Sequence, residues 1–166
     1  MPNYCDYDMR VVGKKENIDE FINVIKADYS YSKEIPATSK HLFRVFEADV
    51  LDDNCYTKED GRYSCDIKGY CAWSVYSCML EGPSTYHDDL KERYPDKFMG
   101  TSLLKLSKEL DLDIEVFSEE PGVGFSEHYL IKNGEFLIEE EKELEFDETE
   151  DGYWTISNRF DSDYVI

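Results

Sequence analysis

The sequence is short of basic residues. Of its 166 residues, 18 are Lys or Arg and 38 are Asp or Glu, which gives a formal net charge of -20. Proteins that bind nucleic acid rely on clustered Lys and Arg to contact phosphates. The composition therefore argues against direct binding to nucleic acid or to an anionic membrane, and it favours a basic protein as partner.

Long apolar runs and targeting signals are also missing. No segment approaches the roughly 20 apolar residues of a membrane span, and the N-terminal MPNYCDYDMRVV lacks the basic start and apolar middle of a signal peptide. We therefore expect a cytoplasmic location in the host cell.

The cysteines do not form a recognisable framework. Their number is odd and no pair has C-x-x-C spacing, so we expect neither a zinc site nor a redox site. Cys65 and Cys71 fall on the apolar phase of an expected strand and are predicted to be buried free thiols. The five cysteines are Cys5, Cys55, Cys65, Cys71 and Cys78.

Catalytic and metal-binding motifs are scarce. The three histidines, His41, His87 and His128, are far apart in sequence, and there is no H-E-x-x-H, G-x-S-x-G or phosphate-binding loop. Residues 147–152 begin like a calcium loop, but its twelfth position is Asn158, which cannot supply the usual bidentate carboxylate. We predict a protein without enzymatic activity, cofactor or metal. A hydrolase that uses scattered carboxylates and a metal is kept as an alternative.

The chain nevertheless has the material for a folded core. Its apolar share is 41% and its aromatic share 14%, which separates it from disordered acidic chains. The length is usual for one domain, and we expect a single domain over residues 1–166.

Alternating and helical apolar patterns predict an α+β fold. Asn17 and Glu20 are expected to form a capping box at the first helix, and Gly69 is expected to mark a bulge. The order is β-α-β-β-α-β, which predicts a ferredoxin-like sheet with two helices on one face and a core over about residues 4–118. The expected strands cover residues 4–12, 41–50, 63–73 and 114–118, and the expected helices cover residues 17–28 and a segment that begins at Thr101 or Ser102.

A hairpin and an acidic segment follow as an extension over about residues 124–166. Residues 128–132 and 135–138 flank Asn133-Gly134, a pair typical of two-residue type I′ turns. The C-terminal YWTISNRFDSDYVI contains enough aromatic residues to pack onto the rest of the fold.

Three motifs resemble a known family. They are the opening Met-Pro-Asn-Tyr-Cys, residues 71–74 (Cys-Ala-Trp-Ser), and residues 120–126 (Glu-Pro-Gly-Val-Gly-Phe-Ser) leading into Lys-Asn-Gly. In order and spacing they resemble the YubB-type ferredoxin-like proteins of bacteriophages and plasmids, over roughly residues 1 to 138. This chain has Tyr4 where the family usually has Trp, and it lacks the prolines that often follow Ala-Trp-Ser. The resemblance implies the fold and a mobile-element origin, but no catalytic residues.

The acid excess is greatest in EEEKELEFDETED. Acids at alternate strand positions lie about 7 Å apart, close to the separation of successive phosphates on a DNA strand. We therefore predict a nucleic-acid mimic that inhibits a host defence system of the CRISPR or restriction type. The alternative is a solvated edge strand whose charges prevent pairing with other sheets. The predicted partner-binding residues are Glu139, Glu140, Glu141, Glu143, Glu145, Asp147, Glu148, Glu150 and Asp151.

Two further alternatives concern other surfaces. A small-molecule or nucleotide-sequestering module would use a pocket around Trp73, Tyr86 and His87. An RNA-binding sheet would need exposed aromatics, and we interpret Tyr70 and Phe117 as packing residues instead. The expected outward strand positions are acidic and would repel phosphates: Asp6, Asp8, Asp66, Asp113 and Glu115.

Overall fold

A computed structural model describes residues 3–27, 39–80, 92–93, 95 and 99–166. Its main element is a seven-stranded sheet in the order β2-β4-β1-β5-β6-β7, with β3 beside β4 and every neighbouring pair antiparallel. A separate two-stranded sheet joins β8 and β9. The strands are β1 (Tyr4–Gly13), β2 (Val45–Val50), β3 (Tyr56–Thr57), β4 (Tyr63–Ala72), β5 (Asp113–Glu120), β6 (Phe125–Lys132), β7 (Glu135–Glu143), β8 (Phe146–Glu148) and β9 (Trp154–Ile156).

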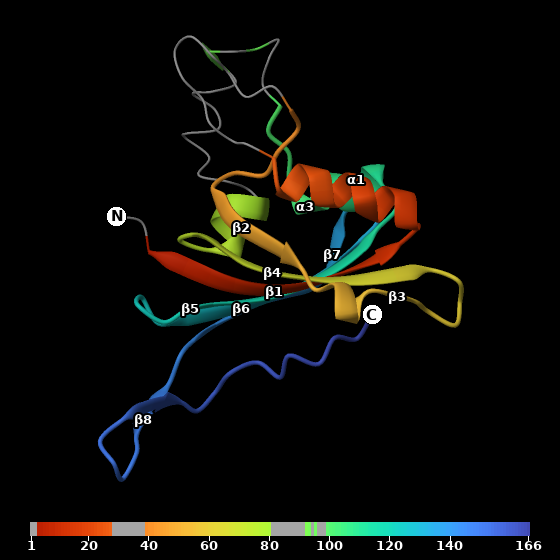
Figure 1. Ribbon diagram of the computed structural model, residues 1–166. Coiled ribbons are helices and arrows are strands. Elements are labelled where there is room, and N and C mark those ends of the chain that lie inside the picture. Colours follow the sequence, from red (N-terminus) through yellow and green to blue (C-terminus); the bar gives the residue numbers. More distant parts are fainter. Residues whose placement is uncertain (1–2, 28–38, 81–91, 94, 96–98) are drawn as a thin grey trace.

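The helices lie above the sheet and the C-terminal segment crosses below it (Figure 1). The α-helices whose full extent lies in the described residues are α1 (Lys15–Ile25) and α3 (Leu103–Glu109). A 3-10 turn covers Asp52–Asn54, and a π-helical turn covers Tyr76–Leu80. The β8–β9 hairpin projects away from both layers (Figure 1). We call the two sides of the main sheet the helix face and the lower face.

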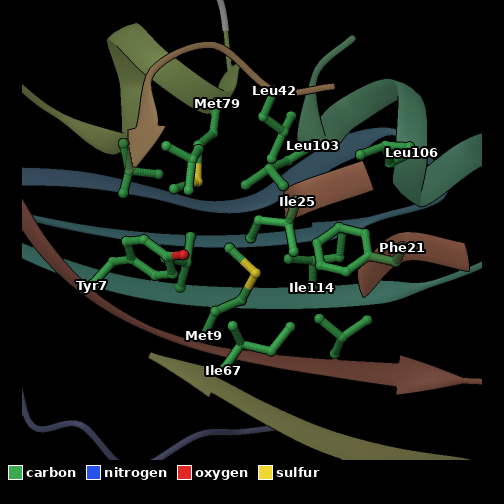
Figure 2. Packing of buried hydrophobic residues seen from close by; sticks show 14 of the residues in the cluster. Tyr7, Met9, Phe21, Ile25, Leu42, Ile67, Met79, Leu103, Leu106 and Ile114 are labelled. Atoms are coloured by element: carbon green, nitrogen blue, oxygen red, sulfur yellow. The ribbon is translucent and has the colours of Figure 1, made fainter. Parts of the chain in front are cut away.

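The main core lies between the sheet and the helices. Alternate residues of β1 point into it, and Cys5, Met9 and Val11 are fully buried, as the alternation predicts. Helix α1 contributes Phe21 and Ile25, which pack against the sheet from above (Figure 2). A smaller cluster on the lower face joins three buried residues, Val12, Leu130 and Ile166.

The predicted ferredoxin-like fold class is wrong, because the protein is mostly β. The hairpin expected as an extension is part of the main sheet, since β6 pairs with β5 along seven residues and β7 pairs with β6. The reason is burial: Tyr129 and Ile131 on β6 are at most 2% exposed and complete the core beneath α3. Periodicity finds such strands but does not say which neighbour they pair with.

Most individual elements agree with the sequence patterns, and the turn chemistry is confirmed at one hairpin. Asn133 and Gly134 both have positive φ, 50° and 78°, as a type I′ turn requires. The expected second strand is shorter than predicted, because Arg44 has a φ of 50° and β2 begins only at Val45.

Two local predictions are wrong. No side chain caps α1, which begins at Lys15, and Asn17 instead donates from Nδ2 to the Leu110 carbonyl at 2.7 Å, tying α1 to the end of α3. The bulge lies on β2 between Val45 and Glu47 rather than at Gly69. A side chain at Gly69 would overlap the Glu47 backbone, so the glycine allows the close approach of β2 and β4.

The cysteines divide into one disulfide and three buried thiols. Cys55 and Cys65 form a disulfide, so the prediction of a free thiol at Cys65 is wrong. Cys5, Cys71 and Cys78 are free and buried, which confirms the prediction for Cys71. The pairing depends on the 3-10 turn and β3, which bring Cys55 back beside β4, and spacing in sequence does not indicate this.

Reduction of the Cys55–Cys65 disulfide should lower the free energy of unfolding. The two cysteines are 10 residues apart, and a loop of that length stabilises by about 2 to 3 kcal/mol through restriction of the unfolded chain. Thermal denaturation with and without dithiothreitol measures the change. A Cys55→Ser variant should have the Tm of the reduced wild type, both with and without dithiothreitol. If the variant responds to reductant as strongly as the wild type, the effect does not come from this bond.

Candidate interaction surface

The nine predicted partner-binding acids are all exposed and lie on two elements. The edge strand β7 carries Glu139, Glu140, Glu141 and Glu143, and the remaining five belong to the β8–β9 hairpin and its entry. The nine acids do not lie on one continuous strand. Leu144 is buried and donates its N–H to the Gly124 carbonyl at 2.8 Å, so the chain leaves the sheet there before β8 begins.

The register of β7 sorts its acids by face. Glu139 and Glu141 lie opposite Tyr129 and Glu127, whose side chains point to the helix face, and Glu143 follows in the same phase. These three carboxylates form a row with a spacing of about 7 Å. Glu140 faces the other side, where its Oε2 lies 3.6 Å from Nδ1 of His128.

The β8–β9 hairpin presents acids beside exposed aromatic rings. Asp147 lies opposite Thr155 and Glu148 lies opposite Trp154. The turn is closed by Thr149, whose N–H donates to the Tyr153 carbonyl and whose Oγ1 accepts from the Tyr153 N–H at 3.1 Å. Tyr153 and Trp154 are 73% and 66% exposed. Glu150 and Asp151 occupy the tip of this turn.

Backbone and side-chain hydrogen bonds hold the base of the hairpin. Asn158 accepts from the Glu145 N–H and donates to the Glu143 carbonyl, both at 2.8 Å. The Ser157 N–H donates to the Glu145 carbonyl at 3.0 Å. Asn158, which a calcium loop would have used as its twelfth ligand, is therefore a structural bridge.

The surface acids are almost free of ion pairs within the described part of the chain. Glu140 is within reach of His128, and none of the other eight is paired with a Lys, Arg or His that the structure describes. Acids elsewhere have such partners: Arg10 binds Asp66 through two bonds of 2.7 and 2.9 Å, and Arg159 binds Glu119 at 2.9 and 3.1 Å. The negative field is therefore concentrated on β7 and the hairpin.

The lower face of the sheet is not an open base-stacking platform. Phe117 is 8% exposed and stacks on the His128 ring at 4.1 Å. Tyr164 of the C-terminal segment lies 4.5 Å from the Arg10 guanidinium, and the Val165 N–H donates to buried Glu115 at 2.8 Å. These contacts confirm that Phe117 is a packing residue.

Tyr70 and two of the acids expected to face outward also have contacts within the protein. Tyr70 is half-buried and packs edge-on against Tyr4, with ring centroids 5.3 Å apart. Asp8 pairs with Lys68 at 2.9 Å, and Asp113 pairs with Arg62 at 2.8 Å.

One carboxylate is buried in the core with a perturbed pKa. Burial raises the pKa of Glu127, and its hydrogen bonds oppose the rise. Each carboxylate oxygen accepts two hydrogen bonds. Oε2 accepts from the Val75 N–H and the Ser118 hydroxyl, and Oε1 accepts from the Tyr76 N–H and the Tyr129 hydroxyl. Glu127 thus satisfies the start of the π-helical turn and is an anchor for that segment, which explains its burial without a catalytic role.

The remaining candidates find little support. Trp73 is 39% exposed and lies 4.7 Å from the Arg44 guanidinium, but Tyr86 and His87, the other residues of the predicted pocket, lie outside the described residues. Within the described ranges, no group of three His, Cys, Asp or Glu side chains is arranged to hold a metal ion. No helix of the described chain is long and apolar enough to cross a membrane.

Sequence reasoning missed the aromatic part of the surface. The prediction that the C-terminal residues pack onto the fold is wrong for Tyr153 and Trp154, which are exposed. It is confirmed for Phe160, Tyr164 and Ile166. The signal that separates the two groups is the polar turn Thr149–Gly152 between two short extended runs, which is typical of a hairpin.

Comparisons with protein-family models, with curated proteins and with solved structures find no match to this chain. The resemblance to YubB-type proteins therefore stays a prediction.

Replacing Glu127 should destabilise the fold. Glu127→Leu leaves two backbone N–H groups and two hydroxyls without their acceptor, and a loss of about 3 kcal/mol or more in the free energy of unfolding is expected. The non-titrating Glu127→Gln variant isolates the charge. Because the folded-state pKa is raised above its ordinary value of 4.5, wild-type stability relative to Gln should be greatest below that value and fall as the pH rises through the raised pKa. Urea unfolding over a pH series measures this, and a pH-independent difference would contradict it.

Proposed function

We propose that this protein binds a basic surface on another protein through the β7 edge and the β8–β9 hairpin. The observation that carries the proposal is the exposure of nine carboxylates, eight of them without an ion-pair partner in the described chain. Such a surface raises the local concentration of basic partners and accelerates their association.

The partner is a nucleic-acid-binding enzyme or effector complex of the host. The row Glu139, Glu141 and Glu143 repeats at about 7 Å, so its carboxylates can contact Lys and Arg side chains that otherwise bind successive phosphates. The resemblance to phage and plasmid proteins supports a host defence system, of CRISPR or restriction type, as the target. The protein would then act in the host cytoplasm as an inhibitor, without chemistry of its own.

The hairpin supplies the apolar part of the contact. Charges at an interface set the rate of encounter, whereas large desolvated side chains such as Trp contribute most to the lifetime of the complex. Trp154 and Tyr153 lie beside Glu148 and the acidic tip, so one element offers both contributions. Arg side chains of a partner can stack on these rings while they pair with the carboxylates.

Reversing the charge of the surface should abolish inhibition. The test variant carries Lys at Glu139, Glu141, Glu143 and Asp147, and the readout is DNA cleavage by purified CRISPR and restriction complexes. A control variant with Lys at Glu16, Glu20, Asp53 and Glu59 has the same net charge but changes α1 and the loop before β4.

The wild type and the control should inhibit at least one complex, and the test variant should not. Inhibition should also weaken steeply between about 50 and 200 mM salt. If the test variant inhibits as well as the wild type, or if both variants lose activity equally, the surface is not the binding site.

Trp154→Ala should shorten the lifetime of the complex with an inhibited target. An exposed aromatic anchor of this kind is worth about 2 kcal/mol when it is buried at an interface, so the dissociation rate should rise roughly 30-fold. The association rate should change little, because the carboxylates are retained. Surface plasmon resonance separates the two rates. Tyr56→Ala, at an exposed ring on β3, is the control, and equal effects of both substitutions would exclude the hairpin as anchor.

A further inference from the structure

A second site lies on the lower face of the sheet. A pocket of about 250 Å³ is formed between β1, β5 and β6 and the C-terminal segment. That segment crosses beneath the sheet (Figure 1). The sheet contributes Asp6, Phe117, Glu119 and Ser126, which we call the floor of the pocket, and the C-terminal segment contributes Phe160 on the opposite side. None of the nine surface acids lines it.

The sheet register brings the polar groups of the floor into one line. Asp6 of β1 lies directly opposite Glu119 of β5, and Glu119 lies opposite Ser126 of β6. In the adjacent line, Asp8 lies opposite Phe117. Side chains at directly opposed positions are about 5 Å apart, so a carboxylate, a hydroxyl and an aromatic ring converge on the same small volume.

Ser126 is the observation that points to a ligand. Its side chain is on the lower face, because neighbouring Glu127 points to the helix face. The residue is 2% exposed, and its Oγ has no hydrogen-bond partner in the described chain. A buried hydroxyl without a partner is unfavourable, and such groups commonly mark a place that another molecule occupies.

The charges of the pocket select a cation. Glu119 is already held by Arg159, and Asp8 by Lys68 at 2.9 Å. Asp6 has no ion pair with a described residue, and its carboxylate is therefore free to accept a cation. An anionic ligand would meet three carboxylates and one guanidinium among the lining residues, so the field excludes it.

The aromatic walls select an organic cation over a metal ion. The Phe117 and Phe160 rings lie 6.5 Å apart and tilted by 49°. The Phe160 ring already interacts with an ammonium group, since Lys142 Nζ lies 3.9 Å from the ring centroid. A hydrated divalent ion gains nothing from such walls, whereas an alkylammonium gains both apolar contact and attraction to the ring. The volume lies just under the range of about 300 to 1,000 Å³ usual for ligand pockets, which indicates a molecule of few heavy atoms.

We propose that this pocket binds a small aliphatic amine. The ammonium group pairs with Asp6, one of its N–H groups donates to Ser126 Oγ, and the methylenes lie against Phe117 and Phe160. The proposal does not depend on the function assigned to the acidic surface.

Isothermal titration with 1,4-diaminobutane tests the site, with 1,4-butanediol as the uncharged match and magnesium chloride as the inorganic cation. The wild type should bind the diamine saturably with one site per chain and should not bind the diol. Asp6→Asn should weaken binding about tenfold or more, because a charge-assisted hydrogen bond is lost. Asp163→Asn removes the same charge from an exposed position that does not line the pocket, and it should bind like the wild type.

Ser126→Ala gives a second, independent readout. Loss of one hydrogen bond should weaken diamine binding about threefold to tenfold. The same substitution removes an unpartnered buried hydroxyl, so the Tm of the free protein should be equal to or higher than that of the wild type.

Four results would overturn the proposal: no saturable binding, diol binding equal to diamine binding, magnesium binding in competition with the diamine, or equal weakening by Asp6→Asn and Asp163→Asn. Inhibition of a target by the Asp6→Asn variant should remain at the wild-type level, which separates failure of this site from failure of the proposed function.

Discussion

The two-residue alternation of the central strand β1 organises the whole molecule. Its core positions, among them Cys5, Met9 and Val11, face the helices, and its other positions face the lower side with three charged groups, Asp6, Asp8 and Arg10. A one-residue slip in register would bury those charges and expose the core, so the apolar face determines the pairing with β4 and β5. Charge is thereby excluded from the main core, with buried Glu127 as the satisfied exception.

The lower face then has to accommodate an unusual density of charge. It does so by pairing acids with the few bases available: Arg10 with Asp66, Lys68 with Asp8, and Arg159 with Glu119. The C-terminal segment covers this layer with Tyr164 and Ile166, which pack on Arg10 and on the small apolar cluster. Of the nine acids on β7 and the hairpin, eight have no ion-pair partner among the described residues, and Glu140 lies 3.6 Å from His128.

The two proposed sites differ in the physics of recognition. The β7 edge and the hairpin are open, charged and partly aromatic, which suits a large basic protein whose approach is guided by long-range attraction. The lower pocket is small, with one free carboxylate, one unpartnered hydroxyl and two aromatic rings. Such a site selects by shape and by local pairing, and it has little influence on encounters at a distance. The two can therefore be tested separately.

Local patterns were sufficient wherever a segment's own residues decide its structure. The alternation of β1, the apolar face of α1, the Asn133-Gly134 turn and the exposure of the acids after Ile138 all follow from the sequence, because each depends on neighbours within a few residues. Other features required contacts between distant segments: the continuation of the sheet through β6 and β7, the Cys55–Cys65 bond, and the use of Asn17 and Asn158 as bridges. Composition alone shows that the protein is acidic and that its acids outnumber its bases. Which acids stay unpaired is a property of the tertiary structure, because pairing depends on which strand lies beside which, and no local pattern specifies that.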